Sequence, residues 1–311
     1  MALLNFKRRE KPAATPGAVN PELEAFLAGY SIEVMPRTAE KVEDFRALLP
    51  AGTRVYIAHI EGVPIDDMVA TARRLAGEGY KVMPHFPARI IRDRAMLDDW
   101  IARYQGEAGV DQALLLAGGV ARPHGDYRDS MQLLESGAFD RAGFTRLHVA
   151  GHPEGNRDID PKGGSANVDA ALMWKQKFSE RTDAKMAIIT QFAFDPGPII
   201  AWVDGLGAEG IDLPVHIGIA GPAKLQTMIK FAIACGVGPS LKVLQKRAMD
   251  ISKLMMPYEP TEVLTRLAAH KAAHPDFNIA AVHFFPLGGI KANANWVTEN
   301  GGSAAKPANA S

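Results

Sequence analysis

The chain has 311 residues, 47% of them hydrophobic, and it carries 35 Lys and Arg residues against 35 Asp and Glu residues. This length suits one domain with a large core, and the balanced charge argues against nucleic acid or an acidic membrane surface as a partner. The single cysteine, Cys235, cannot form a disulfide within the chain, which fits a cytoplasmic protein. We find no apolar run near the ~20 residues of a membrane span, and residues 1–10 lack the apolar core of a secretory signal.

The two ends of the chain differ in composition from its middle. Residues 1–19 combine basic residues with prolines and alanines, and residues 301–311 are mostly small or polar. Such segments cannot bury a core, so we expect a flexible arm and a disordered tail. Asn20 followed by Pro21 is typical of a helix start, with Asn as the cap. The middle, residues 20–300, is therefore predicted to be one catalytic domain.

Eight short apolar stretches predict buried parallel strands. The sixth, Met186–Asp195, is rich in β-branched and aromatic residues, is too short for a helix, and contains the polar Gln191 near its end. The predicted strands are Tyr30–Pro36, Arg54–Ile60, Lys81–Pro87, Gln112–Gly118, Arg146–Pro153, Met186–Asp195, Leu213–Gly221 and Ile279–Leu287.

Helical patterns separate these stretches. Thr38 is predicted to cap a helix after the first strand, and the segment from Ile65 to Gly77 has an apolar stripe that ends at glycine. About 58 residues separate Gly221 from Ile279, enough for three helices. Alternating strands and helices predict a closed (β/α)8 TIM barrel with extra helices after strand 7. The active site of such a barrel lies at the carboxyl ends of its strands.

Polar residues at those strand ends are the candidates for chemistry. Glu33 stands between Ile32 and Val34 in the first strand. Burial would raise its pKa and keep a proton on it near neutral pH, which suits a general acid. Alternatively, Glu33 pairs with a cation such as Arg37. The Gly- and Asp-rich connection over residues 155–166 is long enough to be a functional loop.

Histidines follow three predicted strands, at His59, His85 and His152. The first strand lacks the His-x-His pattern of metal-dependent barrel hydrolases, and the sequence has no Cys–His cluster, so we expect no metal. Three further histidines lie within strands and are interpreted as core residues with hydrogen-bond partners: His148, His216 and His283. Gly118 and Gly119 either admit a ring or phosphate close to the backbone or form a tight turn.

Taken together, six stretches resemble the methylenetetrahydrofolate reductase family. The resemblance extends over roughly residues 28–290. The motifs that carry it are Ser31–Thr38, Pro84–His85, Leu116–Gly119, Ala150–Gly155, Thr190–Asp195 and His216–Pro222.

The resemblance implies an FAD flavoprotein barrel that acts as an oxidoreductase in one-carbon metabolism and methionine biosynthesis. NADH or NADPH would reduce the flavin and leave, and the flavin would then reduce 5,10-methylenetetrahydrofolate to 5-methyltetrahydrofolate. We expect a homo-oligomer with a folate substrate and a nicotinamide cosubstrate. The alternatives are a barrel that mainly oxidises 5-methyltetrahydrofolate or takes electrons from a partner protein, and a metal-dependent barrel lyase or hydrolase without flavin.

The family's site residues map onto this chain one by one. Glu33 matches the general acid and Gln191 matches the glutamine that binds the pterin. The expected cofactor contacts are Ala58, His85, Leu116, Ala117, Gly118, His152, Asn156, Asp169 and Lys177, with altered side chains at His152 and Asn156.

Several positions depart from the family pattern. Gly119 replaces an aspartate that faces flavin N1 and the pterin, Leu225 replaces a stacking phenylalanine, and Gly289 replaces an arginine that can meet the substrate tail. Ala58 stands in place of a threonine. Loss of the charge at Gly119 should ease formation of the anionic reduced flavin, and a contact to the pterin is lost with it.

Overall fold

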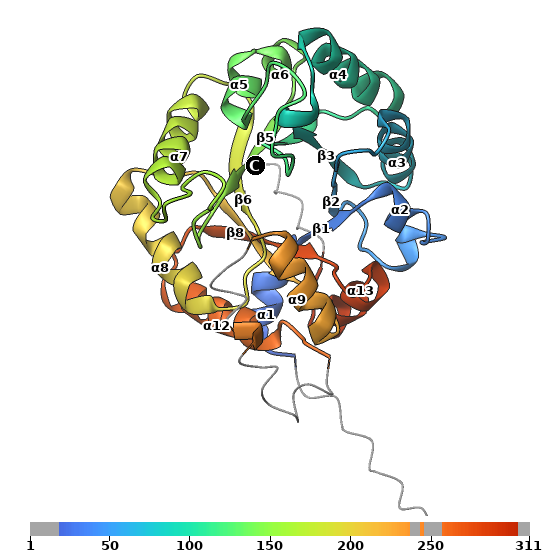
Figure 1. Cartoon of the computed structure of the whole chain (residues 1–311). Helices are drawn as coiled ribbons and strands as arrows, with labels where there is room; N and C mark the ends of the chain where they lie inside the picture. Colours follow the sequence, from blue (N-terminus) through green and yellow to red (C-terminus); the bar gives the residue numbers. More distant parts are fainter. Residues whose placement is uncertain (1–18, 237–242, 246–256, 304–311) are drawn as a thin grey trace, which may run out of the picture.

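The computed structural model describes residues 19–236, 243–245 and 257–303. Eight parallel strands follow one another around a closed barrel, and the first strand pairs with the last, Ser31 opposite His283. Figure 1 shows the helices arranged in a ring around the strands. The predicted (β/α)8 barrel is confirmed.

The strands are β1 Ser31–Val34, β2 Arg54–Ile57, β3 Lys81–Pro87, β4 Gln112–Leu116, β5 Arg146–Gly151, β6 Lys185–Thr190, β7 Val215–Ala220 and β8 Ile279–Phe285. The helices are α1 Pro21–Leu27, α2 Pro36–Ala39, α3 Ile65–Gly77, α4 Arg94–Ala108, α5 Ser130–Glu135, α6 Ala138–Arg141, α7 Ala166–Ser179, α8 Pro196–Leu206, α9 Leu225–Ala234, α12 Thr261–Ala273 and α13 Ile290–Glu299. Short 3-10 turns are η1 Phe45–Ala47, η2 Ala88–Ile90 and η3 Gly207–Glu209.

The segment after β1 differs from its prediction. Helix α2 has only four residues, and Thr38 lies inside it, where its hydroxyl bonds both the N–H and the carbonyl of Met35 at 2.9 Å. Arg74 of α3 donates to the carbonyls of Ala39 and Glu43, at 3.1 and 3.0 Å. The prediction of a helix that starts after Thr38 is wrong, because a side chain from the neighbouring helix bonds carbonyls that such a helix would bond internally.

The chain ends and the connection after β7 are described only in part. Asn20 caps α1 as predicted, accepting from the N–H of Glu22 at 3.0 Å. The predicted tail is wrong in its first three residues, because the carbonyl of Ser303 accepts the N–H of Gly29 at 2.9 Å. Residues 243–245 are helical, and with α9 and α12 they confirm more than one helix between β7 and β8. Residues 1–18 of the predicted arm and 304–311 of the predicted tail lie outside the described residues.

Close contact between β6 and β7 depends on Gly218. A Cβ atom at this position would lie 2.3 Å from the carbonyl oxygen of Thr190 and 2.7 Å from that of Gln191. The missing side chain lets the N–H of Gly218 donate to the Thr190 hydroxyl at 2.8 Å. The backbone at the carboxyl end of β6 is thereby held against β7. Gln191 is the next residue after this end of β6.

We expect Gly218→Ala to lower the free energy of unfolding by roughly 1–3 kcal/mol or more, because the added methyl group forces backbone apart in a packed core. Calorimetric melting would show this as a reduced Tm. Gly205→Ala in α8 is the matched control, since its Cβ would meet nothing within 4 Å. That control should raise stability by about 0.5–1 kcal/mol through helix propensity. Equal Tm values for the two variants would contradict the proposed strand contact.

Candidate functional site

A cavity of about 650 Å³ lies at the carboxyl ends of the strands. Most residues singled out from the sequence line it, which brings together side chains from widely separated parts of the chain. They are Glu33, Ala58, His85, Leu116, Ala117, Gly118, Gly119, His152, Asn156 and Gln191. The structure thus places these residues in one site, while their individual roles remain predictions.

Three predicted residues lie outside this lining. Leu225 is buried in a separate apolar cluster beside Phe192, and Asp169 accepts a hydrogen bond from Ser165 at 2.7 Å at the start of α7. Lys177 is exposed in the last turn of α7. Their matches to ligand contacts stay predictions.

Lys175, and not Lys177, faces the barrel from α7. Its ammonium group donates to the carbonyl of Ala150 at 2.8 Å, and burial lowers the pKa of Lys175 to about 8. Residues two positions apart point to different sides of a helix, so only one of these lysines can pack inward. The signal was present in the sequence, because Lys175 continues the inward stripe begun by Val168 and Leu172.

Glu33 is held by two imidazoles at the cavity. Its Oε2 atom lies 3.2 Å from Nε2 of His85 and 3.8 Å from Nε2 of His283. The Ser31 hydroxyl lies 2.9 Å from Nδ1 of His283, which orients that ring. The partner of Glu33 is therefore His85 from β3, and the alternative pairing with Arg37 is wrong.

The expected upward pKa shift of Glu33 is also wrong. Burial does raise the pKa, as predicted, and is the largest single influence. The charge of His85 and the close approach of both imidazoles outweigh it and lower the pKa of Glu33 to about 2. Burial lowers the pKa of His283 itself, and its Nε2 atom, at 3.8 Å, lies beyond hydrogen-bond distance of the carboxylate.

Histidines also occupy the barrel interior below Glu33. The hydroxyl of Tyr56 lies 2.6 Å from Nδ1 of His148, and the rings of His148 and His216 are 4.7 Å apart. The prediction of core histidines is confirmed for position but only partly for hydrogen bonding. Nδ1 of His216 and Nε2 of His148 have no hydrogen-bond partner in the described part of the chain. Burial lowers the pKa of His216 to about 3, so its ring is neutral at neutral pH.

One wall of the cavity is largely uncharged backbone and apolar surface. Gly118 has a φ of +92°, and a Cβ atom added to it would lie 3.0 Å from the Cβ atom of Pro87, so there is little room for a side chain. On the β5 side, burial and the charge of Lys175 lower the pKa of His152 to about 4, so this ring is neutral too. The Oε1 atom of Gln191 accepts the N–H of Phe192 at 3.0 Å, which leaves its Nε2 group as the donor toward a ligand.

The cavity also contains two carboxylates besides Glu33. Asp158, from the loop after β5, is 2.7 Å from Arg89, and Glu61, from the loop after β2, is 2.9 Å from His124. Among the described lining residues there is no lysine or arginine. Only the Gly- and Asp-rich composition of residues 155–166 hinted at a functional role for Asp158.

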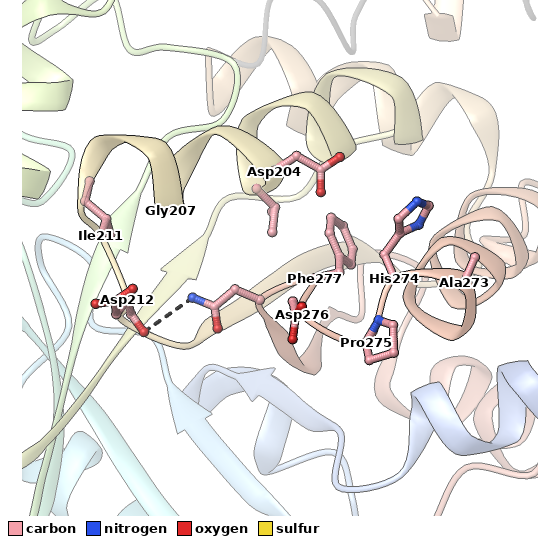
Figure 2. Close-up of a pocket in the computed structure, with 11 residues that line it drawn as sticks. Asp204, Gly207, Ile211, Asp212, Ala273, His274, Pro275, Asp276 and Phe277 are labelled. Atoms are coloured by element: carbon pink, nitrogen blue, oxygen red, sulfur yellow. Dashed lines mark hydrogen bonds between the residues drawn. The ribbon is translucent and has the colours of Figure 1, made fainter.

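Another cavity, of about 710 Å³, lies at the opposite end of the barrel. Figure 2 shows it between the end of α8, the end of α12 and the segments that enter β7 and β8. Asp204, Asp212 and Asp276 line it, and Asn278 donates to the carbonyl of Asp212 at 3.4 Å. Barrel enzymes place their chemistry at the carboxyl ends of the strands, so we assign the functional site to the cavity around Glu33.

No protein-family model matches this chain. A mandelate racemase/muconate lactonizing enzyme from Bordetella bronchiseptica RB50 aligns at 14% identity over 90% of this chain and 61% of its own, with a TM-score of 0.43. The chain therefore spans about three fifths of that protein. Triosephosphate isomerase from Bartonella henselae aligns at 13% identity over 66% of this chain and 87% of its own, with a TM-score of 0.36. A β-mannanase from Thermomonospora fusca, in complex with mannohexaose, aligns at 13% identity over 68% and 76%, also with a TM-score of 0.36. These likenesses carry no inference about reaction or substrate.

The described residues contain no group of three or more His, Cys, Asp or Glu side chains arranged to hold a metal ion. Within the same residues, no helix is both long and apolar enough to cross a membrane.

The buried, neutral His216 should make the fold sensitive to acid. Its folded pKa of about 3 lies below the ~6.5 of an unfolded histidine, so the unfolded chain binds an extra proton between these values. Stability from this residue is complete above pH 6.5 and decreases as pH falls, by about 1.4 kcal/mol per pH unit. Urea unfolding of His216→Phe should therefore depend less steeply on pH between 6 and 4 than wild type. His274→Phe, at an exposed position, should keep the wild-type slope.

Proposed function

We propose that this barrel is a flavin-dependent oxidoreductase that interconverts 5,10-methylenetetrahydrofolate and 5-methyltetrahydrofolate, with NADH or NADPH as the electron donor. The observation that carries the proposal is the placement of Glu33 between His85 and His283 in the same cavity as Gln191. An acid and a ring-binding amide then face one ligand. The reaction needs a proton at the substrate nitrogen that leaves the methylene bridge, and Glu33 is the carboxyl group placed to deliver it.

The residues present fit the ring of FAD better than its pyrophosphate. Leu116, Ala117 and Gly118 offer an apolar wall with accessible backbone, and the nearby His152 is neutral, all of which suit an uncharged flavin ring. The described lining holds three carboxylates and no lysine or arginine. We therefore expect the pyrophosphate to depend on groups outside this lining. When bound, FAD would store the hydride between nicotinamide and folate.

Glu33 becomes an acid only when the cavity is filled. Its side chain is 19% exposed without ligand, so solvent still reaches the carboxylate. A bound folate would remove that solvent and strengthen the burial effect that raises the pKa of Glu33. After the proton has moved to the leaving nitrogen, the nearby imidazoles of His85 and His283 stabilise the carboxylate that remains. Gln191 would orient the pterin through its Nε2 donor.

The absence of a carboxylate at Gly119 favours the reverse direction as a second candidate. Without that charge near flavin N1, the anionic reduced flavin forms more easily, which favours oxidation of 5-methyltetrahydrofolate. Anaerobic titration of the purified protein decides between the candidates. Reduction of bound FAD by NADH or NADPH, followed by reoxidation with methylenetetrahydrofolate, supports a self-sufficient reductase. If 5-methyltetrahydrofolate reduces the bound FAD but NADH and NADPH do not, the result supports the reverse direction, or a partner protein as the source of electrons. A protein that binds neither FAD nor folate contradicts the proposal.

Glu33→Gln should slow folate reduction by about 10²–10⁴-fold, because the amide is nearly the same shape but cannot deliver a proton. Stopped-flow absorbance at the flavin band measures each half-reaction separately. Reduction of flavin by NADH is the internal control, since no bridge opens in that half, and it should change little. Equal slowing of both halves would remove Glu33 from the acid role.

A further inference from the structure

Arg89 brings the carboxylate of Asp158 next to the turn at Gly118 and Gly119. The N–H of Arg89 donates to the carbonyl of Ala117 at 2.9 Å, and its Nη1 atom donates to the carbonyl of Val120 at 3.1 Å. These two carbonyls flank the glycine pair. The same Nη1 atom lies 2.7 Å from Oδ2 of Asp158. The side chain of Asp158 is therefore one guanidinium group away from the carbonyl of Val120, the residue after Gly119.

Asp158 is held in this place from both sides. Its N–H donates to the side chain of Asn156 at 2.8 Å, which fixes the start of the loop after β5. Arg89 is itself fixed, because its Nε atom donates to the carbonyl of Arg128 at 3.1 Å and its side chain is only 17% exposed. The Asp158 side chain is 56% exposed and lines the cavity. Its Oδ2 atom is occupied by Arg89, while the carboxylate as a whole remains open to a ligand.

We propose that Asp158 recognises the hydrogen-bond donor edge of the pterin, and that Arg89 is the positioning residue that places it there. This inference rests on the proposed function. A pterin presents an N–H and an amino group side by side, and a carboxylate accepts such a pair in the way it accepts the paired donors of a guanidinium. Gly119 has no side chain to do so, whereas Asp158, its charge balanced by Arg89, lines the same cavity from the loop after β5.

The other carboxylate candidate, Glu61, is placed less well. It pairs with His124 at 2.9 Å, and both side chains are largely exposed, at 58% and 41%. An exposed pair of this kind is weakly ordered and screened by salt. Within the described part of the chain, Glu61 forms no hydrogen bond to the Gly118 turn, whereas Arg89 links Asp158 to both sides of it. Glu61 is therefore the weaker candidate. The matched control is Asp98, which pairs with Arg94 at 2.7 Å, is 52% exposed and lies outside the cavity lining.

The test is calorimetric binding of 5-methyltetrahydrofolate to FAD-loaded protein. We expect Asp158→Asn to weaken binding by roughly 10- to 100-fold, as for a lost charged hydrogen bond, and Asp98→Asn to leave it unchanged. Asp158→Asn should raise KM for folate and leave the rate of flavin reduction by NADH unaltered, which a general folding defect would not do. Equal effects of the two substitutions, or no effect of Asp158→Asn, would overturn the assignment.

Two further arms separate recognition from structure. A folate analogue that lacks the 2-amino group should bind wild type more weakly than 5-methyltetrahydrofolate, and Asp158→Asn should discriminate less between them. Adding Gly119→Asp to Asp158→Asn should recover part of the affinity, because a carboxylate returns to the same cavity. Failure of both arms would assign Asp158 to loop structure only. If wild type binds no folate probe, the proposed function fails and this inference with it.

Discussion

Closure of the barrel between β1 and β8 is the constraint on which the site depends. It places Ser31 opposite His283 in register, and Glu33, two residues further along β1, comes within 3.8 Å of the His283 ring. His85 reaches the same carboxylate from β3, on the far side of β2. Strands that ran side by side in an open sheet would leave β1 and β8 at opposite edges. Glu33, the His283 ring and the Ser31 hydroxyl therefore come together only because the sheet closes.

The barrel can bury these polar side chains because the histidines are neutral and two of them have hydroxyl partners. Burying a charge without a partner is expensive, and the lowered pKa values of His148 and His216 mean that these rings carry none at neutral pH. Tyr56 and Ser31 supply hydroxyl groups to two of the buried histidines. A barrel filled only with aliphatic side chains would be simpler to pack. It would, however, have no polar group to stabilise the Glu33 carboxylate at the carboxyl ends of the strands.

The wall of the cavity is organised by loops and not by strands. Arg89 follows β3, bonds the loop after β4 at two carbonyls beside the glycine pair, and pairs with Asp158 in the loop after β5. One side chain thus connects three consecutive loops. Arg89 is half-buried, and its two hydrogen bonds restrain a Gly-rich turn that would have many conformations available in isolation.

Sequence periodicity alone determined the eight strands, most helices and the end of the barrel at which polar residues gather. These features follow from local chemistry: apolar runs of strand length, amphipathic stripes and caps such as Asn20. The partner of Glu33 and its low pKa were decided by tertiary structure. So were the short length of the helix after β1 and the meeting of Arg89 with Asp158. Each of these depends on groups far apart in the chain, and a one-dimensional pattern does not contain the distances that decide which of them touch.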